Sequence, residues 1–274
     1  MAELFQRLLL ATEHSEHDAG SDRLAMMLAQ RCGLPLAAVL PMVSNPEYEA
    51  VAPQLVQRAE AVAAERLAGL KALAARSGVV CEPEVRRGES LFREIVEEGK
   101  RLNSDLIVIR RRGRPGLLAN LLVGEMVSQV LAHAPCSVLV TPRSAQMWQR
   151  HVLVALNPAA PDAAALAQGM AIASQCSLPL TLVGVSDGHG TDDAGKALDQ
   201  ALKSAHALVP GARAELLHGK PHQVIVDAAM RLGADLIVVG RRGEGGFARA
   251  WIGGAAQKVI GLSECPVLVA VPRD

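Results

Sequence analysis

RLNSDLIVIRRRGRPG at residues 101–116 and RLGADLIVVGRRGEGG at residues 231–246 are two copies of one pattern, at an offset of 130 (231 − 101). Each copy joins an apolar run, DLIVI or DLIVV, to a turn rich in arginine and glycine. Continuous apolar runs are typical of strands that are buried on both faces of a sheet. The repeat therefore predicts two homologous units, each built around a buried strand that ends in a tight turn.

Two more pairs of segments repeat on either side of this pattern. APCSVLVTPR (134–143) matches ECPVLVAVPR (264–273), and LLLATEH (8–14) matches VLVALNP (152–158). The last pair has an offset of 144 (152 − 8), which exceeds the first offset by 14. The second copy therefore lacks one short segment between its start and its DLIVV run. We predict two domains, 1–146 and 147–274, with their boundary near the polar stretch 143–150.

Short apolar runs alternate with helical periodicity in the first copy. Strands are predicted at 8–11, 34–40, 79–85, 105–109 and 137–141, and helices at 54–76, 91–102 and 122–131. A polar turn over 12–22 precedes a further amphipathic stretch from Leu24 to Arg31, and Gly78 suits a left-handed helix cap. This alternation predicts an α/β fold of two doubly wound parallel sheets of five strands, with helices on both faces. Ligands of such sheets bind outside the carboxyl ends of the strands.

The composition of the 274-residue chain argues against several classes of protein. Half of the residues are hydrophobic but only 2% are aromatic, and 28 basic residues balance 28 acidic ones. We therefore expect no nucleic-acid partner, because such surfaces are basic or rich in stacking aromatics. The longest apolar runs are too short for a membrane span or a signal peptide. The five cysteines are odd in number and form no CxxC pair, which favours a cytoplasmic protein.

The turn after the second DLIVV run carries glycines at an informative spacing. Gly240 and Gly243 enclose two residues, and nine more precede Gly253 and Gly254, where a helix is expected to begin. This G-x2-G-x9-G spacing resembles the nucleotide-binding signature of the universal stress proteins. The resemblance includes the start of both copies and their endings, P-C-x-V-L-V at 135–140 and C-P-V-L-V at 265–269, so the chain is identified as a tandem member of that family. It implies the adenine nucleotide alpha hydrolase-like strand order 3-2-1-4-5. It also implies pairing of the fifth strands, here within one chain as a pseudo-dimer, and two chains could pair further as a homodimer.

The resemblance further implies a site for adenine nucleotide in the second domain, where ATP with Mg²⁺ would bind. The residues that it assigns to this site are Asn157, Val185, Gly240, Arg242, Gly243, Gly253, Gly254 and Ala255. Two of them depart from the family pattern, which has Ser or Thr at Gly254 and Asp at Asn157. Losing one hydrogen bond to phosphate costs roughly 0.5–1.5 kcal/mol, so we expect weakened rather than abolished binding.

The first domain departs further, and we expect no nucleotide there. Arg110 replaces the first glycine, the segment 114–123 that separates Gly113 from Gly124 is one position longer, and Glu125 replaces the Ser or Thr. Glu13 stands where the family has Asp. Arginines follow both DLIV runs, and we interpret them as solvated surface turns with incidental affinity for anions; they are Arg110, Arg111, Arg112, Arg114, Arg241, Arg242 and Arg249.

Other interpretations of the sequence remain as alternatives. Both sites could have decayed, leaving a stress or interaction protein that needs no nucleotide. GVSDG (184–188) matches the nucleophile elbow of serine hydrolases at Ser186, although HGTDD (189–193) reads as a loop rather than the helix that an elbow requires. GTDDAGKA (190–197) only approximates a phosphate-binding loop. The histidines and acids at 13–17 suggest solvation more than a metal site. We expect no catalytic residue, and at most slow ATP hydrolysis.

Overall fold

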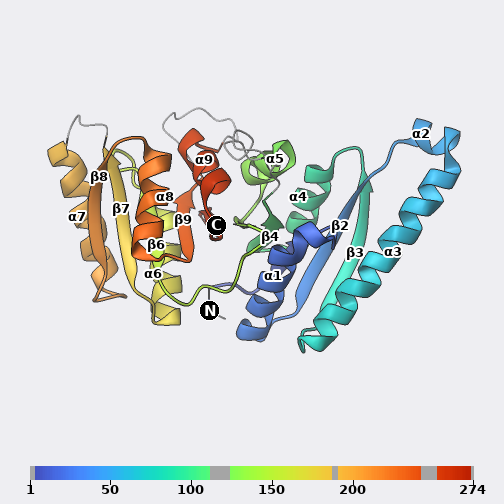
Figure 1. Cartoon of the computed structure of the whole chain (residues 1–274), viewed down its shortest axis with the longest axis horizontal. Coiled ribbons are helices and arrows are strands. Elements are labelled where there is room, and N and C mark those ends of the chain that lie inside the picture. The colour runs from blue at the N-terminus through green and yellow to red at the C-terminus, as the bar shows by residue number, and fades with distance from the viewer. Residues whose placement is uncertain (1–3, 112–123, 187–190, 242–251, 273–274) are drawn as a thin grey trace.

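A computed structural model of the chain describes residues 4–111, 124–186, 191–241 and 252–272 (Figure 1). Strands and helices alternate along both halves. The first half contains β1 (Leu8–Ala11), a 3-10 turn η1 (Glu16–Asp18), α1 (Ala19–Cys32), β2 (Leu36–Val43), α2 (Pro46–Val51), α3 (Pro53–Arg76), β3 (Cys81–Gly88), α4 (Leu91–Arg101), β4 (Leu106–Arg110), α5 (Glu125–His133) and β5 (Ser137–Thr141). The second half contains β6 (Val152–Leu156), α6 (Ala163–Cys176), β7 (Leu180–Ser186), α7 (Thr191–His206), β8 (Arg213–His218), α8 (Pro221–Leu232), β9 (Leu236–Gly240), α9 (Gly254–Leu262) and β10 (Val267–Ala270).

The ten strands of the described residues join into one sheet in the order β3-β2-β1-β4-β5-β10-β9-β6-β7-β8. Within each half the neighbouring strands are parallel, and the order is the predicted 3-2-1-4-5. The halves meet where β5 and β10 pair antiparallel, with Leu139 opposite Leu268. The expected pairing of the fifth strands within one chain is therefore confirmed, and it covers two edges that would otherwise be open.

Helices cover both faces of this sheet along its whole length (Figure 1). One face buries apolar side chains of α1, α3, α6 and α7, and the other buries those of α4, α5, α8 and α9. Alternate residues of one strand serve the two faces: Leu8 and Leu10 lie in the first core, and Leu9 and Ala11 in the second. This two-sided burial explains why the strands read as continuous apolar runs.

The extra segment of the first half lies between its second and third strands. The first two strands keep the offset of 144, since Leu36 and Leu180 pair with Leu8 and Val152 respectively. The third strands have an offset of only 131 (213 − 82), because Glu82 and Arg213 pair with Ala37 and Thr181. The second half is shorter there by the difference between the two offsets. It lacks a counterpart of α2 among the described residues, and its α7 has 16 residues where α3 has 24.

Several element boundaries differ from the prediction. β2 continues through Pro41 to Val43, because the nitrogen of Pro41 faces the side where β1 has already ended at Ala11. The polar stretch 12–22 contains η1 and the first turn of α1 rather than a loop alone. α7 begins at Thr191, so residues 191–193 are helical and not part of a loop. β3 lies at 81–88 instead of 79–85. Gly78 has the predicted left-handed conformation, with φ of +64°.

The two DLIV repeats also anchor the chain that enters each half. The Asp105 carboxylate accepts hydrogen bonds from the backbone N–H groups of Gln6 and Arg7, at 2.7 and 3.1 Å. Asp235 does the same for Gln149, Arg150 and His151. Each aspartate therefore holds the start of the first strand of its half beside the fourth. Asp105 was predicted to lie inside a strand, whereas the structure places it just before β4.

Among the described residues, no helix is both long and apolar enough to cross a membrane.

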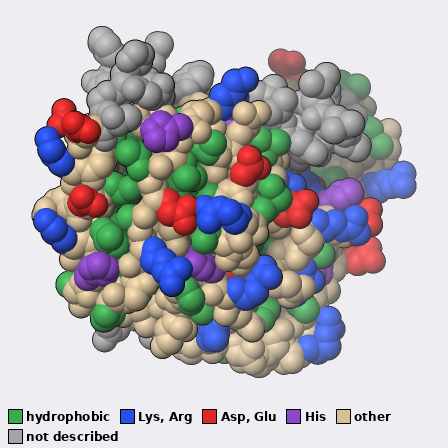
Figure 2. Space-filling view, turned by 60° about the vertical axis from the view of Figure 1, so that its left-hand side comes forward, with side chains coloured by type: hydrophobic (Ala, Val, Ile, Leu, Met, Phe, Trp, Pro, Cys, Tyr) green, Lys and Arg blue, Asp and Glu red, His purple; other side chains and the backbone are tan. Residues whose placement is uncertain are grey.

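The end of the molecule that carries α7 and β8 shows basic, acidic and apolar side chains interspersed over its surface (Figure 2).

Candidate nucleotide site

A cavity of 740 Å³ opens at the carboxyl ends of β6, β7 and β9 in the second half. Its lining includes six of the eight residues that the sequence assigned to a nucleotide site: Asn157, Val185, Gly240, Gly253, Gly254 and Ala255. The other two, Arg242 and Gly243, lie outside the described residues. The expected site residues from three separate strand ends and one helix start thus surround a single cavity. This is the edge of a parallel sheet at which ligands bind.

Gly240 has a steric requirement that the structure makes explicit. A Cβ atom at this position would overlap the carboxylate of Asp162. That carboxylate caps the N-terminus of α6, because its Oδ1 atom accepts the N–H groups of Ala164 and Ala165, both at 3.0 Å. Glycine at 240 therefore lets the end of β9 approach the capped helix and leaves the cavity open above it.

Asp162 lines the cavity but was not among the residues predicted from the sequence. A signal for it exists in the sequence. Pro161-Asp162 precedes the run AAALAQ, and an aspartate directly before a run of good helix formers is a typical helix cap. What the run could not show is that the capped helix starts beside the end of β9.

α9 begins at Gly254, at the rim of the cavity. A Cβ atom on Gly254 would meet no heavy atom within 4 Å, so space remains beside this helix start. The first N–H groups of a helix have no partner inside the helix and carry partial positive charge. An anion in the cavity could accept hydrogen bonds from them.

Charges of both signs lie around the cavity. The carboxylates of Asp162 and Asp193 line it. Burial and the nearby Lys258 and Lys220 lower the pKa of His222, which indicates positive potential at the start of α8. A polyphosphate would therefore meet two carboxylates as well as cations. A magnesium ion held by the phosphates and a carboxylate would reduce that repulsion, because Mg²⁺ prefers such oxygen ligands.

The equivalent place in the first half is filled by an ion-pair cluster. Arg110 ends β4 as Gly240 ends β9, and its guanidinium lies 3.1 Å from Glu13 and 3.2 Å from Asp18. Glu13 and Asp18 correspond to Asn157 and Asp162, since both pairs share the offset of 144. Arg110 is 13% exposed and Asp18 is 1% exposed. The side chain that replaces the glycine therefore occupies the space that stays open in the second half.

The arginines directly after β4 and β9 are not solvated turns as expected. Arg111 donates to the carbonyl oxygens of Ile260, Gly261 and Ser263 at 3.2, 3.1 and 2.5 Å, at the end of α9 in the other half. Arg241 donates to the Ala134 carbonyl at 2.8 Å, at the end of α5. An arginine of each half thus caps the last helix of the other half. The C-terminal end of a helix favours a cation, because its free carbonyl groups carry partial negative charge. Arg112, Arg114, Arg242 and Arg249 lie outside the described residues.

The remaining residues that the sequence brought forward do not form a second site. Ser186 ends β7 and is buried against the cavity, with α7 beginning only at Thr191. His14 and His17 do not share a site: His14 bonds the buried Asp22 through Nδ1 at 2.7 Å, whereas His17 is exposed. Within the described ranges, no group of three or more metal-ligating side chains is arranged to hold a metal ion. Cys136 and Cys265, at the starts of the two fifth strands, pack with the apolar residues of one core.

Comparison with known families decides what kind of chain this is. The model of the universal stress protein family matches residues 4–142 and again residues 149–271. The chain belongs to the universal stress protein family. It is a tandem member with two such domains, as the repeats predicted.

Curated universal stress proteins match shorter stretches of the chain. One from Thermus aquaticus, encoded in a QAH/OAS sulfhydrylase 3' region, is 44% identical over 61 residues, which are 22% of this chain and 44% of that protein. MJ0531 from Methanocaldococcus jannaschii is 39% identical over 74 residues, or 27% of this chain and 44% of its own length. These matches span less than half the length of either relative.

Solved structures show that the tandem fold itself recurs. A universal stress protein from Archaeoglobus fulgidus superposes with a TM-score of 0.72 at 21% identity, covering 98% of this chain and 97% of that one. PA1789 from Pseudomonas aeruginosa, described as functionally unknown, gives a TM-score of 0.71 at 18% identity over 99% of this chain and 94% of its own. At these identities the likeness concerns the fold.

Proposed function

We propose that this universal stress protein binds one adenine nucleotide per chain, in the second domain, and acts as a nucleotide-responsive regulatory or interaction module. The observation that carries the proposal is the asymmetry between two equivalent places. Gly240 and Asn157 leave a 740 Å³ cavity at the carboxyl ends of the strands. Arg110, Glu13 and Asp18 fill the same place in the first domain with ion pairs.

The chemical types of the side chains that line the cavity suit a nucleotide. Val185, Ile225 and Val239 supply apolar surface for a base, and the Asn157 amide and the Asp162 carboxylate supply polar groups. The N-terminus of α9 would face phosphate.

ATP with Mg²⁺ is the ligand that we propose for this cavity. Asp162 and Asp193 are the carboxylates of its lining, and a carboxylate together with phosphate oxygens is a usual setting for Mg²⁺. The proposed role is binding, with hydrolysis slow at most. The strand ends and the start of α9 would hold the nucleotide. Binding of a partner protein would then depend on whether a nucleotide occupies the cavity.

The test introduces the ion-pair residues that fill the site of the first domain at the equivalent positions of the second domain. Gly240→Arg combined with Asn157→Glu installs both partners of the Arg110–Glu13 pair, and Asp162, which corresponds to Asp18, has to turn away from position 240 to admit the arginine. Titration calorimetry of the unaltered protein with ATP and Mg²⁺ should show one site per chain, and the double variant should show none. Asn157→Glu alone is the matched control, because it adds charge while leaving the cavity open.

A chemical analysis of the purified protein complements the titration. Heat-denatured protein should release adenine nucleotide if the site is filled in the cell. If the unaltered protein shows neither released nucleotide nor heat up to millimolar ATP, the nucleotide-independent alternative gains. In that case Gly254→Ser with Asn157→Asp, which restores the family's hydroxyl and carboxylate, should create binding where none existed.

A further inference from the structure

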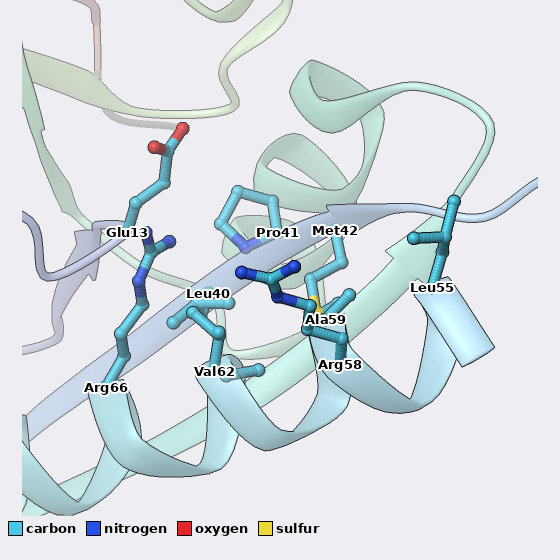
Figure 3. Close-up of a pocket in the computed structure, with 10 residues that line it drawn as sticks. Glu13, Leu40, Pro41, Met42, Leu55, Arg58, Ala59, Val62 and Arg66 are labelled. Atoms are coloured by element: carbon cyan, nitrogen blue, oxygen red, sulfur yellow. The ribbon is translucent and has the colours of Figure 1, made fainter.

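A second cavity of 330 Å³ lies in the first domain, between the end of β2 and the N-terminal half of α3 (Figure 3). Leu40, Pro41 and Met42 of β2 form one wall. The cavity therefore opens at the carboxyl edge of the sheet, beside the closed counterpart of the nucleotide site. The ion-pair cluster of Arg110 seals the space next to β4 but leaves this part open.

The opposite wall is one face of α3. Leu55, Ala59, Val62 and Ala63 line the cavity at spacings of three and four residues, which places them on the same side of the helix. Such a face normally packs against a sheet, yet Leu55 and Val62 are 45% and 39% exposed. A ligand between α3 and β2 would bury this apolar surface, which is favourable.

Two arginines stand on the same wall. Arg58 and Arg66 are two turns apart, about 12 Å along the helix axis. Their guanidinium groups rise from α3 toward the strand end, and Arg66 points to Glu13 (Figure 3). Among the described residues neither arginine joins a salt bridge, whereas Arg86, Arg87 and Arg101 of the same domain all do. Arg58 lies away from Glu13, so its charge is the one available to an anion.

This combination specifies a class of ligand. The walls are apolar, which requires a hydrocarbon body, and Arg58 requires a negative head, for which guanidinium is well matched to carboxylate. Glu13 at the far end disfavours a second anionic group there. The volume is near the lower limit of ligand pockets, about 300 Å³, so the ligand is small. We propose that this cavity binds a small amphipathic carboxylate, with its chain between β2 and α3 and its head on Arg58.

The anion-binding residue of this site belongs to the first domain alone. Arg58 lies on the additional turns of α3, because Thr191, the first residue of α7, corresponds to Glu60 at the offset of 131 (191 − 60). Leu40, Pro41 and Met42 correspond to Gly184, Val185 and Ser186 at the offset of 144. The proposal therefore does not rest on nucleotide binding in the second domain, and either one can fail alone.

Titration calorimetry with decanoate below its micelle concentration tests this proposal on the full chain. We expect saturable binding of one decanoate per chain, and much weaker binding of decanol, which has the same chain without the charge. Arg58→Gln should weaken decanoate binding roughly fivefold, as expected for a partly exposed ion pair. Ala59→Trp should abolish binding by filling the cavity. Arg76→Gln, at the exposed end of the same helix, is the matched control and should leave binding unchanged.

Three results of these titrations would overturn the proposal. They are the absence of saturable decanoate binding, equal affinity for decanol, and an affinity that survives both Arg58→Gln and Ala59→Trp. We expect the variants to fold, because all three altered side chains are exposed, and circular dichroism and melting curves check this. Binding that persists in Gly240→Arg with Asn157→Glu would place the ligand outside the nucleotide cavity, as proposed, and binding lost in that variant would contradict the assignment to the first domain.

Discussion

At the scale of single residues, the position that ends the fourth strand decides what each domain can hold. Gly240 lets the end of β9 pack against Asp162 with the cavity open above them, whereas Arg110 reaches Glu13 and Asp18 and fills the corresponding space. The arginine is compatible with the fold because Glu13 supplies a carboxylate where the other domain has Asn157, and Asp18 supplies a second one at the position of Asp162. An arginine substitution that came without Glu13 would bury a charge with one partner fewer.

Removing the arginine should cost stability. Arg110→Gly leaves Glu13 and the buried Asp18 without their cation, and we expect a loss of about 3 kcal/mol in the free energy of unfolding, measured by urea denaturation. Arg110→Gly combined with Glu13→Asn copies the second domain and should recover part of that loss. Equal stability of the single variant and the unaltered protein would contradict an ion-pair role for Arg110.

His151 predicts how stability depends on pH. Burial lowers its pKa below the ordinary 6.5, despite the opposing effect of Asp235, and its Nε2 atom lies 2.9 Å from the buried hydroxyl of Thr181. The fold therefore favours the neutral imidazole. Its contribution is present above pH 6.5 and is lost as the pH falls from there toward the lowered pKa. Unfolding free energies should fall less steeply in His151→Asn than in the unaltered protein as the pH drops from neutral to mildly acidic; identical slopes would contradict this.

At the scale of elements, α3 is the helix in which the first domain differs most from the second. Its C-terminal half buries Leu70 and Ala74, but its N-terminal half leaves Leu55 and Val62 partly exposed. Helices gain most of their stability from packing of an apolar face. We therefore expect substitutions in the N-terminal half of α3 to change the stability of the protein less than substitutions in its C-terminal half.

Two matched substitutions in α3 test this division. Leu70→Ala should destabilise the protein by about 2–5 kcal/mol, because it creates a cavity in the core. Val62→Ser should change the free energy of unfolding by about 0.5 kcal/mol or less, as for an ordinary surface position. Denaturation curves of both variants measure the difference. Similar losses for the two would mean that the whole helix is packed with equal tightness.

The elements of this fold were predicted from the sequence better than their ends were. Strands such as β4 and β9 are buried on both faces of the sheet and are therefore recognisable as apolar runs. The repeat also shows each of these patterns twice in the sequence. The end of β2 was missed because Pro41 usually stops a strand, and only the sheet shows that no neighbour needs its N–H. The start of α7 was missed because Thr191-Asp192-Asp193 reads equally as a polar loop or as the acidic first turn of a helix.

The candidate site was predicted only where glycines and strand ends mark it. Six expected residues surround one cavity, but their role in binding remains a prediction. Asp162 was missed because its place beside Gly240 depends on how α6 and β9 pack. The contacts of Arg111 and Arg241 were beyond reach, since each joins segments that are far apart in the sequence and belong to different domains.

At the scale of the whole molecule, the two domains form one continuous body. Pairing of β5 with β10 makes a single sheet, and hydrogen bonds from Arg111 and Arg241 tie each strand-end turn to the last helix of the other domain. Gln168 adds a buried link between Ser137 and the Val271 carbonyl. The strand end that borders the candidate nucleotide cavity is therefore held by the other domain.

These contacts predict an order of effects. Arg111→Met removes the hydrogen bonds that the two N–H groups of Nη1 share among three carbonyl oxygens at the end of α9, and should cost about 2–3 kcal/mol in unfolding free energy. Arg241→Met removes the hydrogen bond to the Ala134 carbonyl, and we expect this to cost about 1 kcal/mol. Thermal melts of both variants and of the double variant measure the difference. A larger loss for Arg241→Met would contradict the assignment of the main interdomain cap to Arg111.

The central claim is that one of two homologous sites is open and the other is closed by its own side chains. Equilibrium dialysis with labelled ATP and Mg²⁺ measures it directly, as the number of nucleotides bound per chain at saturation. We predict one for the unaltered protein and zero for Gly240→Arg with Asn157→Glu. A stoichiometry of two, or one that the double variant leaves unchanged, would contradict this claim.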